Sequence, residues 1–369
     1  WTKEQSDAIN KDGTNIIVSA GAGSGKTAVL SERVLRKVKE GIDIRQILNL
    51  TFTNEAAGEM KERIRKKLEK EQLVEQLSYL DAAYITTFDA YALSLVKKYH
   101  YLFNLSSNIS ILDSSIINLE KKRILDEIIM ELYEEKDVNY LKLVRDFTER
   151  DDDMIRKYIL DISNALDLRY DKTEYLNTYI EKYYSLDYVD KIFDEYFQYL
   201  KNLTLLIEDD FYLLESFLTE KNYQSCYDAL TPIFKPRSYK DLYQCHVSLP
   251  TFRGLDLDGK EIKEDLKRLV KELNELTVYS EEELKKQILS TKEYVLAIID
   301  IILKLDQRIQ TYKREKNAFE FVDISKMAIS IMKDHPTIRD EIKYSYQEIM
   351  IDEYQDTNDV QEEFISYIS

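Results

Sequence analysis

The sequence predicts an α/β fold in which a parallel sheet with helices on its faces is interrupted by a large all-helical insertion. Three short strand-like segments, each followed by a helical pattern, occur before Tyr99, and this alternation predicts a parallel sheet. They begin at Ile16, Ile47 and Tyr84. No glycine occurs between Gly58 and Gly254, so little interrupts helix formation over that span. Another apolar strand, Ile349–Ile351, indicates that the chain returns to the sheet near its end.

The same pattern divides the chain into three segments. We expect residues 1–107 to form the first part of the sheet domain, 108–311 the helical insertion, and 312–369 the second part of the sheet domain. Apolar residues recur at helical spacing in the insertion. One clear run is Ile155, Ile159, Ile162 and Leu166. Prolines and glycines cluster from Pro232 to Gly259, which predicts one irregular stretch before helices resume near Glu261.

Composition argues against several classes of protein. The 369 residues carry a net charge of −17 at pH 7, which disfavours a protein that holds nucleic acid by bulk attraction but leaves room for a local basic groove. The two cysteines and three histidines lack metal-type spacing, so we expect reduced, structural cysteines. No apolar run is long enough to span a membrane and no signal peptide is present, which predicts a cytoplasmic protein without a membrane partner. The chain begins without Met and ends directly after a strong motif, so we expect a fragment.

A glycine-rich turn between the first predicted strand and a long helix has the composition of a phosphate-binding loop. Its residues are Ala20, Gly21, Ala22, Gly23, Ser24, Gly25, Lys26 and Thr27. Small residues let several backbone N–H groups converge on one anion, and the helix N-terminus adds its dipole. Lys26 can reach the outer phosphates of ATP, and the Thr27 hydroxyl suits Mg²⁺. The strict pattern has glycine at Ala20, which we interpret as a variant loop; a flexible loop with an incidental lysine is the alternative.

Gln5, upstream of this loop, is a candidate for adenine recognition. Its side-chain amide has both a donor and an acceptor, as reading an adenine edge requires, and Trp1 offers a flat face. Without the loop that follows, these residues would indicate only a surface helix.

Polar and aromatic residues follow the second and third predicted strands. They are Thr51, Phe52, Thr53 and Asn54 after the second strand, and Thr87, Phe88 and Asp89 after the third. The carboxyl ends of parallel strands meet at one edge of a sheet, where ligands bind. Hydroxyl and amide groups beside an aromatic ring suit a phosphate and a base, which predicts DNA binding by Thr51 to Asn54 and by Thr87 and Phe88. Thr53 or Asn54 would also cap the next helix, whose interleaved charges are typical of a solvated face.

Two adjacent carboxylates, Asp352 and Glu353, follow the last predicted strand. They would repel each other unless a cation is bound, so Asp352 is expected to hold Mg²⁺ opposite Thr27. Glu353 would orient and deprotonate the water that attacks the terminal phosphate, and Gln355 would sense that phosphate or couple it to a neighbouring site. An ordinary acidic loop is the alternative.

Together, these motifs resemble the first motor domain of the UvrD/Rep/PcrA group of superfamily 1 DNA helicases. The residues that carry the resemblance are Gln5, Ala20 to Thr27, Thr51 to Ala57, Thr87 to Asp89, Phe319 to Asp323 and Asp352 to Asn358. They cover both predicted parts of the sheet domain, whereas the helical insertion matches only loosely. The group usually has His at the position of Asp89, where an acidic side chain would repel a phosphate.

Within this group the sequence is most similar to the AddA subfamily of helicase-nuclease subunits, which act in bacterial double-strand-break processing. The similarity rests on Met60–Ile64 and on Ile109–Asp113, which leads into the insertion. It implies a partner protein similar to AddB and substrates that include single-stranded and duplex DNA.

The resemblance also implies a mechanism. The sheet domain would be a RecA-like motor domain (1A) and the insertion domain 1B, and the motor would use ATP to step 3′ to 5′ along single-stranded DNA. Arginine fingers come in this family from a second RecA-like domain, which these residues lack. We therefore expect the isolated chain to bind ATP and Mg²⁺ but to hydrolyse ATP very slowly.

Three other interpretations stay open. A stand-alone repair helicase of the UvrD or PcrA kind would lack a downstream nuclease domain. An inactive DNA-binding scaffold would keep its properties when Glu353 is replaced. A P-loop nucleotidase unrelated to nucleic acid is disfavoured by the residues after the second and third strands. The insertion could grip duplex DNA or a partner protein, and its many tyrosines could pack helices or stack on bases.

Overall fold

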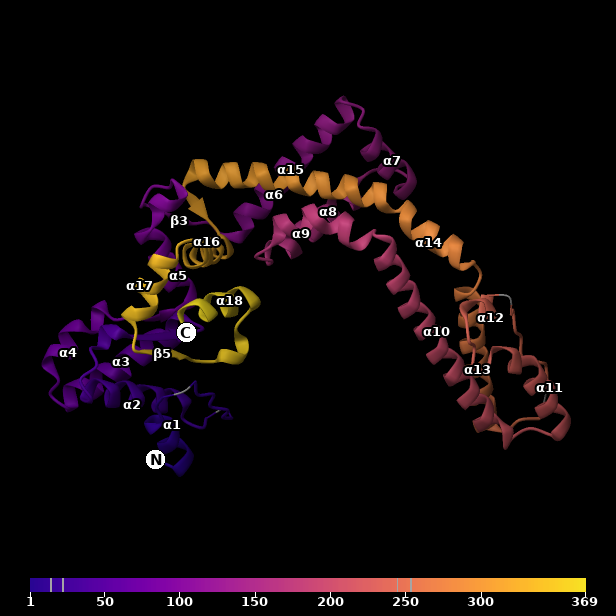
Figure 1. Ribbon diagram of the computed structural model, residues 1–369, viewed down its shortest axis with the longest axis horizontal. Coiled ribbons are helices and arrows are strands. Elements are labelled where there is room, and N and C mark those ends of the chain that lie inside the picture. The colour runs from indigo at the N-terminus through magenta and orange to yellow at the C-terminus, as the bar shows by residue number, and fades with distance from the viewer. Residues whose placement is uncertain (14, 22, 244, 253) are drawn as a thin grey trace. The chain divides into compact units, whose positions relative to one another are not determined.

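The computed structural model describes residues 1–13, 15–21, 23–243, 245–252 and 254–369 (Figure 1). The chain is mostly helical with a small parallel sheet. It forms two compact units: the first comprises Trp1–Met130, Arg156–Lys172 and Lys304–Ser369, and the second Glu131–Ile155 and Thr173–Leu303. The first unit thus holds both predicted parts of the sheet domain, while the boundaries predicted at 107 and 311 stay a prediction.

The sheet of the first unit confirms three of the predicted strands. Its order is β2 (Ile85–Thr87), β1 (Ile47–Thr51), β5 (Glu348–Ile351), and both pairings are parallel. Asn49 of β1 lies opposite Ile85 on one side and Met350 on the other. The three strands therefore end at the same edge, and the last strand of the chain joins one formed about 300 residues earlier, as the βα pattern requires.

The predicted first strand, Ile16–Val18, is wrong. The described segment 15–21 contains no strand, and the side chains of Ile17 and Val18 are 88% and 53% exposed. A strand forms only where a neighbouring strand accepts its backbone hydrogen bonds. Among the described residues, no strand pairs with this segment, so its apolar sequence is not sufficient.

Helices cover both faces of the sheet, which gives three layers. Side chains alternate along β1: Ile47 contacts the cluster formed with α2 (Lys26–Lys39) and α3 (Asn54–Lys70). Leu48 and Leu50 contact the opposite cluster, formed with α5 (Phe88–Lys98), α16 (Phe321–Asp334) and α18 (Asp359–Ile368). Thr53 and Thr87 cap α3 and α5 through their hydroxyls, so two predicted site segments also start these helices.

The other elements of the first unit are shorter or continue into the second. Those within it are α1 (Lys3–Asn10), α4 (Val74–Tyr79), β3 (Ser110–Ile111), β4 (Ala318–Phe319) and α17 (Pro336–Ser345). Those with residues in both units are α6 (Ser114–Glu134), α8 (Asp153–Asp167), α9 (Lys172–Tyr183) and α15 (Lys292–Lys316). Strands β3 and β4 form a separate parallel pair.

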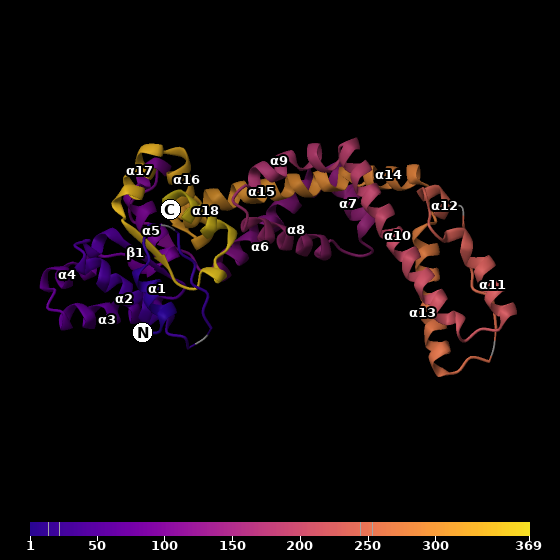
Figure 2. The same ribbon diagram turned by 60° about the horizontal axis from the view of Figure 1, so that its bottom comes forward.

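The second unit is helical, as the absence of glycine predicts. Besides parts of the shared helices it holds α7 (Val138–Phe147), α10 (Leu186–Glu215), α11 (Glu220–Leu230), α12 (Tyr239–Tyr243), α13 (Leu257–Leu276) and α14 (Glu281–Ser290). Helices α10 and α13 lie side by side, with Phe211 and Leu266 fully buried in the core they share (Figures 1 and 2). The predicted irregular stretch contains one short helix, α12, and helices resume at Leu257 rather than near Glu261.

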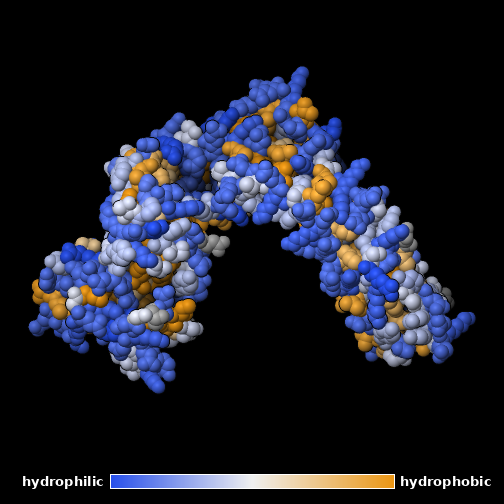
Figure 3. Space-filling view, in the orientation of Figure 1, coloured by the Kyte–Doolittle hydropathy of each residue, from blue (hydrophilic) through white to orange (hydrophobic). Residues whose placement is uncertain are grey.

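Exposed apolar side chains are interspersed with hydrophilic ones on the face seen in Figure 3. Of the helices within the described ranges, none combines the length and apolar character that crossing a bilayer demands.

Candidate functional site

The glycine-rich loop leads directly into α2. Gly23 and Gly25 adopt positive φ angles of 75° and 84°, which favour glycine over other residues. A Cβ added at Gly21 or Gly23 would meet no atom within 4 Å, so the space beside the loop is open. Gly25 begins α2 without a side-chain cap, which leaves the first-turn N–H groups of this 14-residue helix suited to an anion. Ala22, also predicted to line the loop, lies outside the described residues.

Lys26, the first residue of α2, forms an ion pair with Glu353. Its Nζ lies 2.8 Å from Glu353 Oε2, although 327 positions separate the two residues. Gln355 Nε2 donates to the same oxygen at 2.5 Å. The hydrogen bond from Lys26, with help from Gln355, lowers the pKa of Glu353, and the same pair raises the pKa of Lys26. The glycine loop and the acidic strand end therefore meet in one site.

Glu353 also has an unusual backbone. Its φ and ψ angles of 54° and 45° are left-handed, a conformation that costs free energy in a residue other than glycine. The turn directs the side chain of Glu353 toward Lys26 immediately after β5 ends. Such strain is commonly found at functional sites, because packing elsewhere compensates for it.

Asp352 lies beside Glu353 in a more buried place. Its N–H donates to Leu50 O at 2.9 Å, which extends the pairing of β5 with β1, and its Oδ1 accepts from Glu353 N at 3.1 Å. Burial and repulsion by Glu353 raise the pKa of Asp352. A carboxylate that is unfavourable when ionised is suited to neutralisation by a cation.

The donor set fits Mg²⁺ held mainly by a nucleotide. In the part of the chain that the structure describes, no group of three or more His, Cys, Asp or Glu side chains could hold a metal ion by itself. Mg²⁺ at nucleotide sites takes one or two protein ligands and fills its other positions with phosphate oxygens and water. Asp352 and Thr27 are the candidate ligands of this kind.

Gln5 lies against the glycine loop. Its Nε2 donates to Ser24 O at 3.0 Å, and its Oε1 accepts from Thr2 N at 2.9 Å in the capping box of α1. The structure thus brings the predicted base-reading amide to the predicted phosphate loop.

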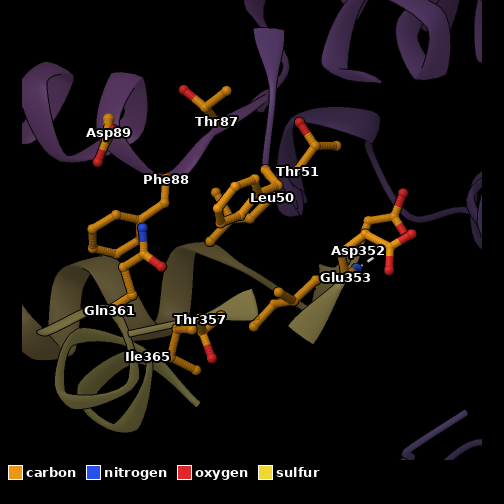
Figure 4. Close-up of a pocket in the computed structure, with 12 residues that line it drawn as sticks. Leu50, Thr51, Thr87, Phe88, Asp89, Asp352, Glu353, Thr357, Gln361 and Ile365 are labelled. Carbon is orange, nitrogen blue, oxygen red and sulfur yellow. Dashed lines mark hydrogen bonds between the residues drawn. The ribbon is translucent and has the colours of Figure 1, made fainter. Parts of the chain in front are cut away.

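The strand ends form a hollow beside the acidic pair (Figure 4). It is lined by Leu50, Thr51, Phe52, Thr87, Phe88, Asp89, Ile351, Asp352, Glu353, Thr357, Gln361 and Ile365. Phe52 is 56% exposed, and Thr53 and Asn54 are exposed next to it. These three side chains are accessible to a nucleic-acid strand.

The third strand end differs from its prediction. Phe88 is only 6% exposed and packs edge-to-face on Phe364 with ring centroids 5.2 Å apart, so stacking of Phe88 on a base is wrong for this conformation. The hydroxyls of Thr51 and Thr87 are engaged locally, with Thr53 O at 3.0 Å and Ala90 N at 3.2 Å. The sequence pattern could not separate a buried Thr-Phe pair from an exposed one.

Asp89 is half-buried in the first turn of α5. Burial raises the pKa of its carboxyl.

Sequence reasoning missed three charged residues behind the site: Asp12, Arg33 and Glu348. Arg33 donates to Glu348 Oε1 at 2.7 Å and to Asp12 Oδ1 at 3.2 Å, and its side chain is 9% exposed. An arginine two helical turns after Lys26, among the buried Val29, Val34 and Leu35, was the available signal.

Comparison with known proteins agrees with this geometry. Residues 1–369 match the family described as the UvrD/REP helicase N-terminal domain. ATP-dependent helicase/nuclease subunits of the AddA type from Ligilactobacillus salivarius, Clostridium beijerinckii and Leuconostoc mesenteroides are 29%, 29% and 30% identical to the chain over its whole length. The chain spans about a third of the length of these relatives (33%, 33% and 34%). It therefore belongs to the UvrD/REP helicase N-terminal domain family.

Proposed function

We propose that the chain is the ATP-binding part of a DNA helicase of the AddA kind, a motor that steps 3′ to 5′ along single-stranded DNA. The observation that carries the proposal is the contact between Lys26 of the glycine loop and Glu353 of the acidic strand end. A site that holds a phosphate chain beside a carboxylate base needs these two residue types together. The names of the relatives support the same activity.

The nucleotide would lie along the glycine loop. Backbone N–H groups of the loop and of the first turn of α2 would hold its phosphates, Lys26 would bind the outer ones, and Gln5 would read the adenine edge. Bound Mg²⁺, with Thr27 and Asp352 as ligands, would supply charge neutralisation at the transferring phosphate. Lys26 would leave Glu353 to bind phosphate, and the pKa of Glu353 would then rise towards its ordinary value. Glu353 would become a better base for the attacking water, with Gln355 as its second partner.

DNA would bind at the same edge of the sheet. Phe52 offers a ring for base stacking, and Thr53 and Asn54 offer polar groups for the backbone. Thr51 and Thr87 would position this edge from below through their local hydrogen bonds. The DNA strand and the nucleotide would thus share β1 and β5, which gives a direct route for coupling.

The finer domain assignment belongs to this proposal. Residues 1–107 and 312–369 would form a RecA-like domain 1A and 108–311 domain 1B, with the second motor domain and a nuclease domain supplied by a longer protein. That protein would act on single-stranded and duplex DNA in double-strand-break repair, in the cytoplasm, with a partner similar to AddB. The isolated chain would bind ATP and Mg²⁺ but turn over very slowly, because it lacks the arginine fingers.

Steady-state ATP hydrolysis by the full-length protein tests the proposal. Glu353→Gln should lower kcat by at least about 100-fold while ATP binding persists, because the general base is lost and the phosphate cradle is kept. Lys66→Ala, which removes a lysine on α3 whose side chain is 72% exposed, is the matched control and should leave kcat unchanged. Undiminished DNA-stimulated hydrolysis by Glu353→Gln would favour the inactive scaffold, and rapid turnover by residues 1–369 alone would contradict the division of labour.

A further inference from the structure

Arg33 of α2 has all three nitrogens of its guanidinium directed at partners on other elements. Nη1 lies 3.0, 3.2 and 2.7 Å from the carbonyl oxygens of Ala8, Ile9 and Lys11. Nε donates to Glu348 Oε1 at 2.7 Å, and Nη2 donates to Asp12 Oδ1 at 3.2 Å. A planar fork with five donors can make such contacts, whereas a lysine ammonium cannot.

The carbonyl contacts hold the C-terminal end of α1. The last carbonyls of a helix have no partner within the helix, and a buried guanidinium satisfies them and opposes the negative end of the helix dipole. Arg36 adds a bond from Nη1 to Asn10 O at 2.7 Å, and Lys37 adds one to Asp12 Oδ1 at 2.6 Å. Ile9 is the one buried apolar residue of the eight in α1. Polar contacts with α2 therefore fix this short helix more than apolar packing does.

The opposite end of α1 carries Gln5, whose Nε2 bonds Ser24 O in the glycine loop. Arg33 thus holds the far end of the helix that presents the predicted base-reading amide. Through Glu348, the first residue of β5, it also holds the strand that ends in Asp352 and Glu353. One side chain on the phosphate-binding helix joins the base-reading helix and the catalytic strand.

We infer that Arg33 is a positioning residue that sets the place of Gln5 relative to the phosphate loop, and that it thereby determines the preference of the site for an adenine nucleotide. The inference rests on the proposed function, because it needs a nucleotide in the loop. Arg33 lies behind α2 and acts through α1, without contacting the nucleotide.

Competition binding tests the inference. A fluorescent ATP analogue with Mg²⁺ is bound to residues 1–369 and displaced by unlabelled ATP or GTP, which gives a ratio of the two affinities. Wild type should prefer ATP by about tenfold, the worth of one or two base-edge hydrogen bonds. Arg33→Lys keeps the charge but loses the fork, so the ratio should fall to about 1–2.

A double-mutant cycle separates positioning from general destabilisation. Gln5→Ala should lower the ratio as Arg33→Lys does, and the double variant should lower it no further, because both act through one amide. Arg45→Lys removes an exposed fork that bonds Asp43 and should leave the ratio unchanged. Asp12→Asn, which keeps Arg33 but weakens its anchor, should give an intermediate ratio and replaces Arg33→Lys if that variant does not fold.

The outcomes distinguish the two levels of the account. If wild type binds no ATP, the proposed function fails and the inference with it. If wild type prefers ATP and Arg33→Lys keeps the full preference, the proposed function stands and the inference is overturned. A further loss in the double variant, beyond that of Gln5→Ala, would also overturn a role exerted through Gln5.

Discussion

Lys26 and Glu353 share a hydrogen bond of 2.8 Å across 327 positions of the chain. The pair neutralises a carboxylate at the end of a parallel strand and a lysine at the start of a helix. It also means that, in the absence of nucleotide, the carboxylate competes with phosphate for Lys26. Binding of ATP therefore has to break this pair, and the cost of breaking it belongs to the observed affinity.

Replacing Glu353 by Gln should consequently strengthen ATP binding while it abolishes hydrolysis. The neutral amide keeps the shape but holds Lys26 less strongly, so the dissociation constant should fall by about 2- to 10-fold. Equilibrium titration with ATP and Mg²⁺ measures this change. Binding weakened tenfold or more would show that Glu353 helps to hold the nucleotide and does not compete with it.

Replacing Asp352 by Asn should stabilise the protein that has no nucleotide. Burial and the neighbouring Glu353 raise the pKa of Asp352 in the folded state, so its ionised form opposes folding at pH 7. This unfavourable contribution is present above the folded pKa and fades as pH falls through it, since the protonated form is the favoured one. We expect a rise of roughly 1–3 °C in melting temperature at pH 7, and no rise at pH 3. An unchanged or lower melting temperature at pH 7 would contradict the assignment, and Mg²⁺-dependent nucleotide binding should weaken in the same variant.

Two helical glycines should respond oppositely to alanine. At Gly259 in α13 a Cβ would lie 3.0 Å from Phe217 Cγ and 3.2 Å from Asp256 Oδ1, so Gly259→Ala should destabilise the second unit by about 1–3 kcal/mol. At Gly58 in α3 a Cβ would meet no atom within 4 Å, so Gly58→Ala should stabilise by about 0.5–1 kcal/mol. Urea unfolding followed by circular dichroism measures both. Equal effects of the two substitutions would contradict the packing around α13.

A buried lysine joins the end of α15 to the start of α16. Lys313 is 4% exposed by its side chain and bonds Asp323 Oδ2 at 2.5 Å and Glu320 Oε2 at 2.7 Å. Lys313→Met would leave both carboxylates without their cation, at a cost of about 3–5 kcal/mol of unfolding free energy. Lys267→Met, which breaks an exposed pair with Glu264, should change it by less than about 1 kcal/mol. A loss of similar size in both variants would contradict the burial of Lys313.

The parts of the fold that sequence could predict are those with a local signal. Strands β1, β2 and β5 and the helices that follow them each carry an apolar run and a capping residue within a few positions, as Thr53 and Thr87 illustrate. The segment Ile16–Val18 carries the same local signal but forms no strand, because pairing depends on a partner that a local pattern does not report.

The candidate site shows the same division. Lys26, Asp352 and Glu353 could be predicted because phosphate chemistry restricts residue type and spacing. The burial of Phe88 could not, because it depends on Phe364 in a helix formed 276 positions later. Arg33 was missed because its partners, in α1 and β5, come from segments whose proximity only the folded sheet creates.

The central claim is that the glycine loop and the acidic strand end form one nucleotide site. Its most direct test is the binding of a fluorescent ATP analogue to residues 1–369, with and without Mg²⁺, for wild type, Lys26→Ala and the exposed-lysine control Lys66→Ala. We predict Mg²⁺-dependent binding by wild type and by Lys66→Ala, and a loss of at least about tenfold for Lys26→Ala. Absence of binding by wild type, or equal binding by all three proteins, would contradict the claim.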